Sequence, residues 1–310
     1  MLKKHLTIIF VSLSLIIPNL AMALTLPQNG NELADMVGIR AAAYAVMDIE
    51  SGQVVISKNP ALPRIPASLT KLVTVLVVLD AKPKMSKAVA MTSADQAAGL
   101  CLQRGVCIKS KAGVKFSVDG LLHAALILSA NNAASALARS TGFSAAEFAA
   151  KMNEKALSLG AKNSYFVEPT GLDPNNIVTA EDYVKIVAAA FASPYLSKIA
   201  GLPSYALRST NNSKYNQTIK NSNKLLADSD IQLLGAKTGY LDESSYNFAA
   251  LIKYRNGGKF AVVVLGEDHL YNAFAETKTL AKLADEARVL AILRQLPIIL
   301  GTSTLSTFNN

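Results

Sequence analysis

The chain has 310 residues, of which 51% are hydrophobic and 17% are charged, and its formal net charge is +9 at pH 7. This length and hydrophobicity allow a substantial buried core, in one large domain or two small ones. The positive residues are scattered along the sequence without a long basic stripe, which argues against a nucleic-acid-binding protein. A diffuse charge of this kind is consistent with contact with an anionic polymer and equally with simple solubility.

The N-terminus has the pattern of a secretory signal. Lys3 and Lys4 precede an apolar run over residues 6–17, and Ala21-Met-Ala23 is a small-x-small cleavage site. The apolar run is too short to span a bilayer, which favours cleavage over a membrane anchor. We therefore expect a signal peptide over residues 1–23 and an exported protein, periplasmic or otherwise extracytoplasmic, either soluble or loosely associated with the wall. No stable membrane anchor is expected, including in the tail at residues 297–310.

Strand patterns occupy both ends of the mature chain, and helix patterns fill the middle. The expected strands are 44–48, 53–57, 234–240, 246–254 and 259–265, and the expected helices are 67–80, 118–138, 144–159, 181–191 and 274–296, with a loop-rich stretch at 82–118. This order predicts an α+β fold, in which an antiparallel sheet built from both chain ends is flanked by helices and carries an inserted helical lobe. The domain is expected over residues 39–296, after an N-terminal segment at 24–38.

Cysteine and histidine are both rare in this sequence. Cys101 and Cys107 are the only cysteines, and an exported chain favours a disulfide between them over two free thiols. His123 and His269 are the only histidines after residue 23, and neither has a ligand-like neighbour at helical spacing. We therefore expect no metal site and no cofactor.

Three short motifs follow one another along the chain: Ser68-Leu-Thr-Lys71, Ser129-Ala-Asn131 and Lys237-Thr-Gly239. Ser68 and Lys71 are three residues apart, so they share a face of the helix that Pro66 introduces. A serine hydroxyl needs a base to become a nucleophile, and Lys71 can act as that base only when it is neutral. Burial and a second cation, such as Lys237, would both lower its pKa.

The other two motifs supply the remaining groups of an acyl-transfer site. Ser129 is expected to relay a proton to the leaving amine, and Asn131 to bind the substrate amide and the Lys71 amine. Lys237 and Thr238 are candidates for binding a substrate carboxylate, and Gly239 for close approach of the substrate backbone. The backbone N–H groups of Ser68 and Tyr240 are candidates for an oxyanion hole. Each motif alone is more simply explained as an N-cap, a polar break or a turn. The inference of an acyl-transfer site rests on the three motifs occurring together in this order.

With these motifs the chain resembles the low-molecular-mass penicillin-binding proteins, which are serine D-alanyl-D-alanine carboxypeptidases and D,D-endopeptidases. The resemblance covers roughly residues 40–295. It extends to the stretches 65–71, 132–134, 166–172 and 221–226. It implies a β-lactamase/D,D-peptidase-like fold, acylation of Ser68 by peptidoglycan stem peptides followed by hydrolysis, and covalent inhibition by β-lactam antibiotics.

Two departures from the family pattern bear on substrate choice. Many members continue into a β-rich domain and an amphipathic tail, whereas few residues follow the last expected helix here. Many also carry an arginine where this chain has Asn272-Ala-Phe-Ala-Glu276. Both features resemble the endopeptidase branch, which cuts cross-links between D-Ala and diaminopimelate. The alternatives are a β-lactamase, which needs a deacylating glutamate that the stretch from Glu168 does not match, and an inert wall-binding protein.

Overall fold

A computed structural model describes residues 30–295 of the protein, except for residues 104, 230, 255 and 256. The expected signal peptide (1–23) and C-terminal tail (297–310) lie outside the described residues and stay predictions. Within the described part, no helix combines the length and the apolar character that crossing a membrane requires.

The core of the fold is a five-stranded antiparallel sheet with the strand order β2-β1-β9-β8-β7. Its strands are β1 (Ala43–Asp48), β2 (Val54–Lys58), β7 (Gln232–Leu241), β8 (Ser245–Lys253) and β9 (Lys259–Glu267). Strand β1 pairs with β9, so the first part of the chain lies in the centre of the sheet beside the last part. The expectation of an antiparallel sheet built from both chain ends is confirmed.

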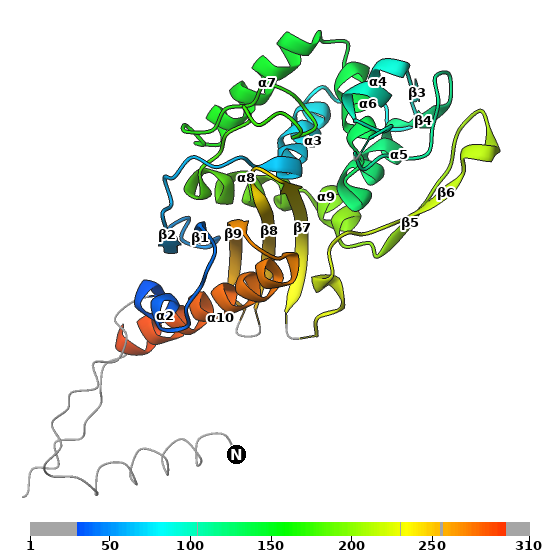
Figure 1. Ribbon diagram of the computed structural model, residues 1–310. Helices are drawn as coiled ribbons and strands as arrows, with labels where there is room; N and C mark the ends of the chain where they lie inside the picture. Colours follow the sequence, from blue (N-terminus) through cyan, green and yellow to red (C-terminus); the bar gives the residue numbers. More distant parts are fainter. Residues whose placement is uncertain (1–29, 104, 230, 255–256, 296–310) are drawn as a thin grey trace, which may run out of the picture.

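Helices cover both faces of this sheet (Figure 1). α8 (Ala180–Ala192) lies against one face, and α2 (Gly30–Met36) and α10 (Leu270–Gln295) lie against the other. Successive side chains of β9 point to opposite faces of the sheet and so enter different cores. Val263 belongs to the core on the α8 side, and Val262 and Val264 belong to the core on the α10 side. Such a strand is apolar on both faces, as β9 is between its terminal residues Lys259 and Glu267.

The helical lobe is inserted between β2 and β7. It contains η1 (Ala67–Thr70), α3 (Lys71–Asp80), α4 (Ser93–Ala98), α5 (Val118–His123), η2 (Ala124–Leu128), α6 (Asn131–Ser140), α7 (Ala145–Ser158) and α9 (Pro194–Ala200), with the small sheets β3 (Ala88–Ala90)–β4 (Lys115–Ser117) and β5 (Ser204–Leu207)–β6 (Gln217–Lys220). Ser144 and Thr179 cap the N-termini of α7 and α8, because their side chains accept hydrogen bonds from the backbone N–H groups of Glu147 and Asp182.

The expectation of one continuous helix over residues 118–138 is wrong. The chain forms α5, then the π-turn η2, and then breaks at Ser129, which has a left-handed φ of 68°. The helix restarts at Asn131, whose backbone N–H bonds to the carbonyl of Val106 instead of to the preceding turn. The break places Ser129 and Asn131 on the inner surface of the lobe, where a straight helix would have separated them. The last helix also starts earlier than expected, at Leu270, and the stretch 82–118 contains β3, α4 and β4.

Candidate active site

Ser68 lies on a tight turn that two glycines approach closely. It belongs to η1, and the preceding Ala67 has a φ of +49°. A Cβ on Gly171 would lie 2.0 Å from the Ala67 carbonyl oxygen, and a Cβ on Gly239 would lie 2.7 Å from that of Pro66. The two glycines therefore let a loop and strand β7 pack directly on the backbone of this turn. Gly239 was expected to make room for substrate; the close approach seen here is to the turn itself.

Lys71 is completely buried at the start of α3, and its amine contacts three oxygen atoms. Its Nζ lies 2.8 Å from Ser68 Oγ, 2.6 Å from Asn131 Oδ1 and 2.5 Å from the carbonyl oxygen of Thr170. The amide and carbonyl oxygens can only accept hydrogen bonds. A neutral amine has two hydrogens and one lone pair. With both hydrogens given to Asn131 and Thr170, the lone pair is left for the Ser68 hydroxyl, as a general base requires.

The surroundings of Lys71 favour its neutral form. Burial lowers the pKa of its amine to about 7, and the negative charge of Glu168 opposes that shift. Burial also lowers the pKa of Lys237 well below its ordinary value, and the positive charge of Lys71 lowers it further. Since repulsion between two buried cations is relieved when one of them loses its proton, the site favours one charged and one neutral lysine near neutral pH.

Lys237 is paired with the second serine. Its Nζ lies 2.7 Å from Ser129 Oγ and 2.8 Å from the carbonyl oxygen of Thr238. Ser129 is 8% exposed and Lys237 is 1% exposed, so this contact is shielded from water. The structure thus brings all three sequence motifs together, with one lysine beside each serine.

Asn131 is held on its other side by the loop that contains the two cysteines. Its backbone N–H donates to the Val106 carbonyl at 2.7 Å, and its Nδ2 donates to the Gly99 carbonyl at 3.4 Å. Cys101 and Cys107 are joined by a disulfide in the same loop. The neighbouring Asn132 is buried and bonds through its side chain to both the backbone N–H and the carbonyl of Ile108. The loop therefore fixes the asparagine that contacts Lys71.

The turn from Glu168 to Leu172 is organised around the Glu168 carboxylate. That carboxylate accepts hydrogen bonds from the backbone N–H groups of Thr170 and Gly171 at 2.6 and 2.5 Å, and from Asn176 Nδ2 at 2.6 Å. These bonds direct the Thr170 carbonyl towards Lys71. The role of Thr170 is missed by the sequence analysis, because a backbone carbonyl leaves no mark in side-chain patterns; the Pro-Thr-Gly turn is the one signal. Among the described residues no hydrogen bond joins Glu168 to Ser68, and the Glu168 carboxylate is engaged within its own turn.

Strand β7 lies at one edge of the five-stranded sheet and forms one wall of the site. Thr238 Oγ1 lies 2.7 Å from Ser222 Oγ, a contact that the sequence analysis also misses. Tyr240 is half exposed, and its ring stacks on that of Tyr246 with 4.4 Å between centroids. Its side chain does not join the lysine–serine cluster; the part of Tyr240 expected to act is its backbone N–H.

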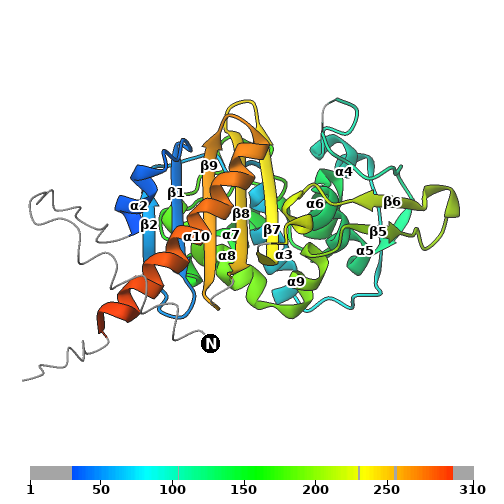
Figure 2. The ribbon, with the colours of Figure 1, turned by 90° about the horizontal axis from the view of Figure 1, so that it is seen from below.

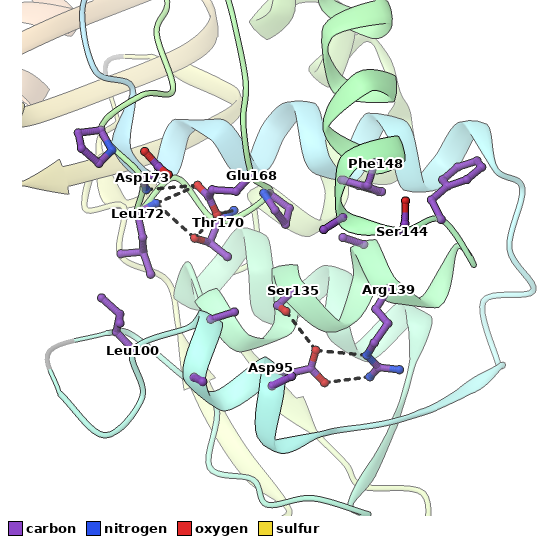
Figure 3. Close-up of a pocket in the computed structure, with 18 residues that line it drawn as sticks. Asp95, Leu100, Ser135, Arg139, Ser144, Phe148, Glu168, Thr170, Leu172 and Asp173 are labelled. Carbon is purple, nitrogen blue, oxygen red and sulfur yellow. Dashed lines mark hydrogen bonds and ion pairs between the residues drawn. The ribbon is translucent and has the colours of Figure 1, made fainter.

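A large cavity lies beside this cluster and not within it. It has a volume of about 820 Å³ and is enclosed by α4, α6, the start of α7 and the Glu168 turn (Figure 3). Ser68, Lys71, Ser129 and Lys237 do not line it, but Thr170 does. On its far wall, Asp95 is bonded to Ser135 and Arg139.

No group of metal-ligating side chains occurs in the part of the chain that the structure describes. His123 stacks on Tyr205 with centroids 3.8 Å apart, and its Nδ1 contacts the Asp119 carbonyl. Its surroundings are therefore those of a packing residue.

The sequence matches the D-alanyl-D-alanine carboxypeptidase family, peptidase S11, over residues 30–269. A D-alanyl-D-alanine endopeptidase of Pseudomonas aeruginosa is 30% identical over 294 residues, which cover 94% of this chain and 92% of that protein. A D-alanyl-D-alanine carboxypeptidase of Mycobacterium tuberculosis is 33% identical over 228 residues, covering 73% of this chain and 74% of the relative.

Solved structures agree with these matches. A D-alanyl-D-alanine carboxypeptidase from Mycobacterium tuberculosis superposes with a TM-score of 0.69 at 29% identity, covering 78% of this chain and 90% of that one. A variant of a Streptomyces DD-transpeptidase superposes with a TM-score of 0.74 at 24% identity, covering 80% and 99%, which shows the shared fold. With the family match and the relatives taken together, the chain belongs to the D-alanyl-D-alanine carboxypeptidase family of serine peptidases.

Proposed function

We propose that the protein hydrolyses peptidoglycan stem peptides through an acyl-enzyme on Ser68, and that it cleaves D-Ala to diaminopimelate cross-links as well as terminal D-Ala. The observation that carries this proposal is the contact between Ser68 Oγ and the buried, low-pKa amine of Lys71. A nucleophile and a base in hydrogen-bond contact, with the base oriented by further partners, form the minimal unit of covalent catalysis by serine.

In the acylation step, Ser68 Oγ attacks the carbonyl carbon of the scissile amide while its proton passes to Lys71 Nζ. The backbone N–H groups of Ser68 and Tyr240 stabilise the oxyanion that forms. The carbon–nitrogen bond then breaks, and the leaving amine takes a proton from Ser129 Oγ, which is replaced from Lys71. The Lys237 amine, 2.7 Å from Ser129 Oγ, donates a hydrogen bond to that oxygen while its proton is in transit. The product is an ester between Ser68 and the shortened stem peptide.

Hydrolysis repeats the same proton transfers in reverse. A water molecule takes the place of the leaving amine, loses a proton towards Lys71 or Ser129, and attacks the ester carbonyl. Ser68 regains its proton as the ester bond breaks. Since the Glu168 carboxylate is engaged within its own turn, no additional carboxylate base speeds this step. We therefore expect slow hydrolysis of a penicilloyl ester, and long-lived β-lactam adducts.

Substrate is expected to lie along β7 as an added strand, since that strand ends the sheet. Lys237 and Thr238 then bind a carboxylate beyond the scissile bond. Cross-link cleavage is supported by the endopeptidases among the relatives of this chain, from Pseudomonas aeruginosa, Haemophilus influenzae and Escherichia coli, at 27–30% identity. Export from the cytoplasm is supported by the Cys101–Cys107 disulfide.

The test combines covalent labelling with digestion of defined substrates. The wild type and the Ser68→Ala variant are each incubated with penicillin, and the peptides are analysed by mass spectrometry. We expect one adduct, on the peptide that contains Ser68, and none in Ser68→Ala. Purified muropeptide dimers and pentapeptide monomers are then digested with both proteins. An adduct elsewhere, or peptide cleavage that survives in Ser68→Ala, would refute the proposal.

A further inference from the structure

The excess positive charge of the chain comes from two stretches of sequence. Residues 96–118 and 183–227 contain ten of the 31 lysines and arginines and none of the 22 acidic residues. The rest of the chain therefore holds 21 positive against 22 negative residues. The net charge of +9 is not distributed evenly, although no single basic run marks it in the sequence.

The fold brings parts of these two stretches together. The β5–β6 hairpin contacts the start of β4: the backbone N–H of Thr210 donates to the Lys115 carbonyl, and Asn211 Oδ1 accepts from the Lys115 backbone N–H. Further along, the Gln217 side chain bonds to both the N–H and the carbonyl of Lys109. We name residues 109–115 and 204–220 the basic arm. It projects from the lobe at the end of the molecule opposite α2 and the last turns of α10 (Figures 1 and 2).

The cations of the basic arm are free to bind a partner. All of them are exposed, and none forms an ion pair with an acidic side chain among the residues that the structure describes: Lys109, Lys111, Lys115, Arg208, Lys214 and Lys220. The arm itself contains no acidic residue. Like charges held together without counter-charges repel one another, and an anionic partner relieves that repulsion.

The rest of the arm suits a peptide or sugar polymer better than a lipid surface. Its tip, residues 211–216, consists of asparagine, serine, lysine and tyrosine. None of its aliphatic side chains is among the exposed large hydrophobic residues, as insertion into a bilayer would require. A hollow of about 260 Å³ lies between β5 and β6, where Arg208 stands beside the amides of Asn216 and Gln217. A guanidinium next to amide groups is suited to a carboxylate on a polar chain.

The base of the arm lies beside the catalytic cluster. Residues 221–223 follow β6 directly, and there the Ser222 backbone N–H donates to the Ile127 carbonyl while Ser222 Oγ contacts Thr238 Oγ1. Ile127 is two residues before Ser129, and Thr238 follows Lys237. A polymer bound along the arm is therefore led towards the wall of the site formed by β7.

We propose that the basic arm binds polymeric peptidoglycan through the free carboxylates of its stem peptides, away from the bond being cleaved. This inference rests on the proposed function, which supplies the substrate. Its consequence is a preference for intact wall polymer over soluble fragments, since a fragment with a single stem cannot occupy the arm and the catalytic cluster together. The contribution is electrostatic, so it weakens as salt rises.

The test uses two matched sets of substitutions in the full chain. The arm variant carries Lys111→Gln, Lys115→Gln, Lys214→Gln and Lys220→Gln. The control variant carries Lys84→Gln, Lys162→Gln, Lys253→Gln and Lys259→Gln, which are also exposed and lie outside the arm. Both sets lower the net charge equally. Each is made with and without Ser68→Ala, so that binding is measured without cleavage, by co-sedimentation with purified insoluble peptidoglycan at low and high salt.

We expect the arm variant to bind the insoluble polymer on the order of tenfold more weakly than wild type at low salt, with the difference reduced at high salt. The control variant should bind as wild type does. Rates of penicillin acylation and of soluble dimer cleavage should be unchanged in both, which separates this proposal from the proposed function. Amidation of the polymer carboxylates should abolish the difference between wild type and arm variant.

Three outcomes overturn the inference. The arm variant retains wild-type binding; or the control variant loses as much binding, so that only net charge counts; or the difference in binding between wild type and arm variant persists after amidation of the carboxylates. A further experiment uses vesicles of phosphatidylglycerol. Arm-dependent flotation with these vesicles, without arm-dependent sedimentation with peptidoglycan, assigns the arm to a membrane surface and also refutes the proposal.

Discussion

The amine of Lys237 lies 2.7 Å from Ser129 Oγ, and both residues are buried. Together with the contact between Lys71 and Ser68, this gives the site two lysine–serine pairs that come from separate parts of the chain. The two lysines are not equivalent. Two of the three oxygens around Lys71 can only accept hydrogen bonds, which leaves its lone pair for Ser68 once it is neutral, whereas Lys237 stands beside the serine expected to deliver the proton.

Replacement of Lys71 by arginine should nearly abolish acylation. A guanidinium cannot lose its proton in this pH range, so it cannot accept the Ser68 proton. We expect the acylation rate to fall on the order of a hundredfold or more, as removal of a general base does. The measurement is the rate of labelling by a fluorescent penicillin, with thermal unfolding as the control for folding. Acylation of Lys71→Arg at close to the wild-type rate would remove Lys71 from the role of base.

The acylation rate of the wild type should rise with pH through about 7. Burial lowers the pKa of Lys71 to about 7, and only the neutral amine accepts a proton, so the active fraction is small below that pH and approaches one above it. The profile is measured with a neutral β-lactam ester, so that titration of the ligand does not contribute. A rate that falls with increasing pH between 6 and 8 would contradict this assignment.

Replacement of Gly171 by alanine should lower the acylation rate and the stability more than the strain of a positive φ alone would. Its Cβ would lie 2.0 Å from the Ala67 carbonyl oxygen, so the turn that holds Ser68 or the turn from Glu168 to Leu172 must move. Gly113 is the matched control: its φ is +84° against +83° for Gly171, but a Cβ there meets nothing within 4 Å. We expect Gly113→Ala to cost about 1 kcal/mol of stability or slightly more, and to acylate normally.

For Gly171→Ala we expect the acylation rate to fall at least tenfold, together with a lower unfolding temperature, because small displacements of reacting groups are costly. Equal acylation rates in the two alanine variants would mean that the close approach of Gly171 to Ala67 does not position Ser68.

Removal of the disulfide should slow acylation, although neither cysteine touches Ser68 or Lys71. The loop closed by Cys101 and Cys107 lies against Asn131 through the carbonyls of Gly99 and Val106. In Cys101→Ser, Cys107→Ser we expect acylation to slow by roughly tenfold. Stability should drop by roughly 2–3 kcal/mol at most, since the closed loop is short.

The acylation rate is measured well below the unfolding temperature. Free thiols are titrated first in the denatured, unreduced wild type, and none should be found. Adding Asn131→Ala to both the wild type and the double serine variant tests whether the disulfide acts through Asn131. With Asn131 replaced, loss of the disulfide should change the acylation rate little. If the double serine variant acylates at the wild-type rate, the loop does not position Asn131.

Cross-linked dimers should be cleaved at a rate comparable to or above release of D-Ala from pentapeptide monomers. At the start of α10, Asn272 donates a hydrogen bond to Glu267, so this position supplies no cation for a terminal carboxylate. A charge-assisted contact of that kind is worth about 1.5–3 kcal/mol, and its absence raises tolerance for a longer chain. The measurement is the ratio of the two kcat/KM values. If monomers are preferred by more than tenfold, the enzyme is a carboxypeptidase.

Much of this site could be predicted from the sequence because its reactive groups are side chains in short motifs. Ser68, Lys71, Ser129, Asn131 and Lys237 meet as their motifs indicate. The strands and most helices follow from hydrophobic periodicity, which β9 illustrates with an apolar residue on each face in turn. The fold class followed from the placement of strands at both ends of the chain.

The features that escaped prediction depend on backbone geometry or on contacts between distant segments. The π-turn before Ser129 interrupts a run that is apolar and helical by every local signal. The Thr170 carbonyl and the close approaches of Gly171 and Gly239 involve the main chain, which sequence patterns do not report. The gathering of lysines on the basic arm was hidden because its two segments are about a hundred residues apart and neither alone is a basic run.

The pairing of β1 with β9 determines when the sheet can form as the chain folds. Ala43 pairs with Leu265, so the centre of the sheet cannot close until more than two hundred intervening residues have been made. Contacts over such separations form slowly. Lys71 and Lys237 also lie within that interval, and Lys237 belongs to β7 of the same sheet. We therefore expect that a chain whose last strand has not yet been made lacks the completed sheet, and with it the position of Lys237 beside Ser129.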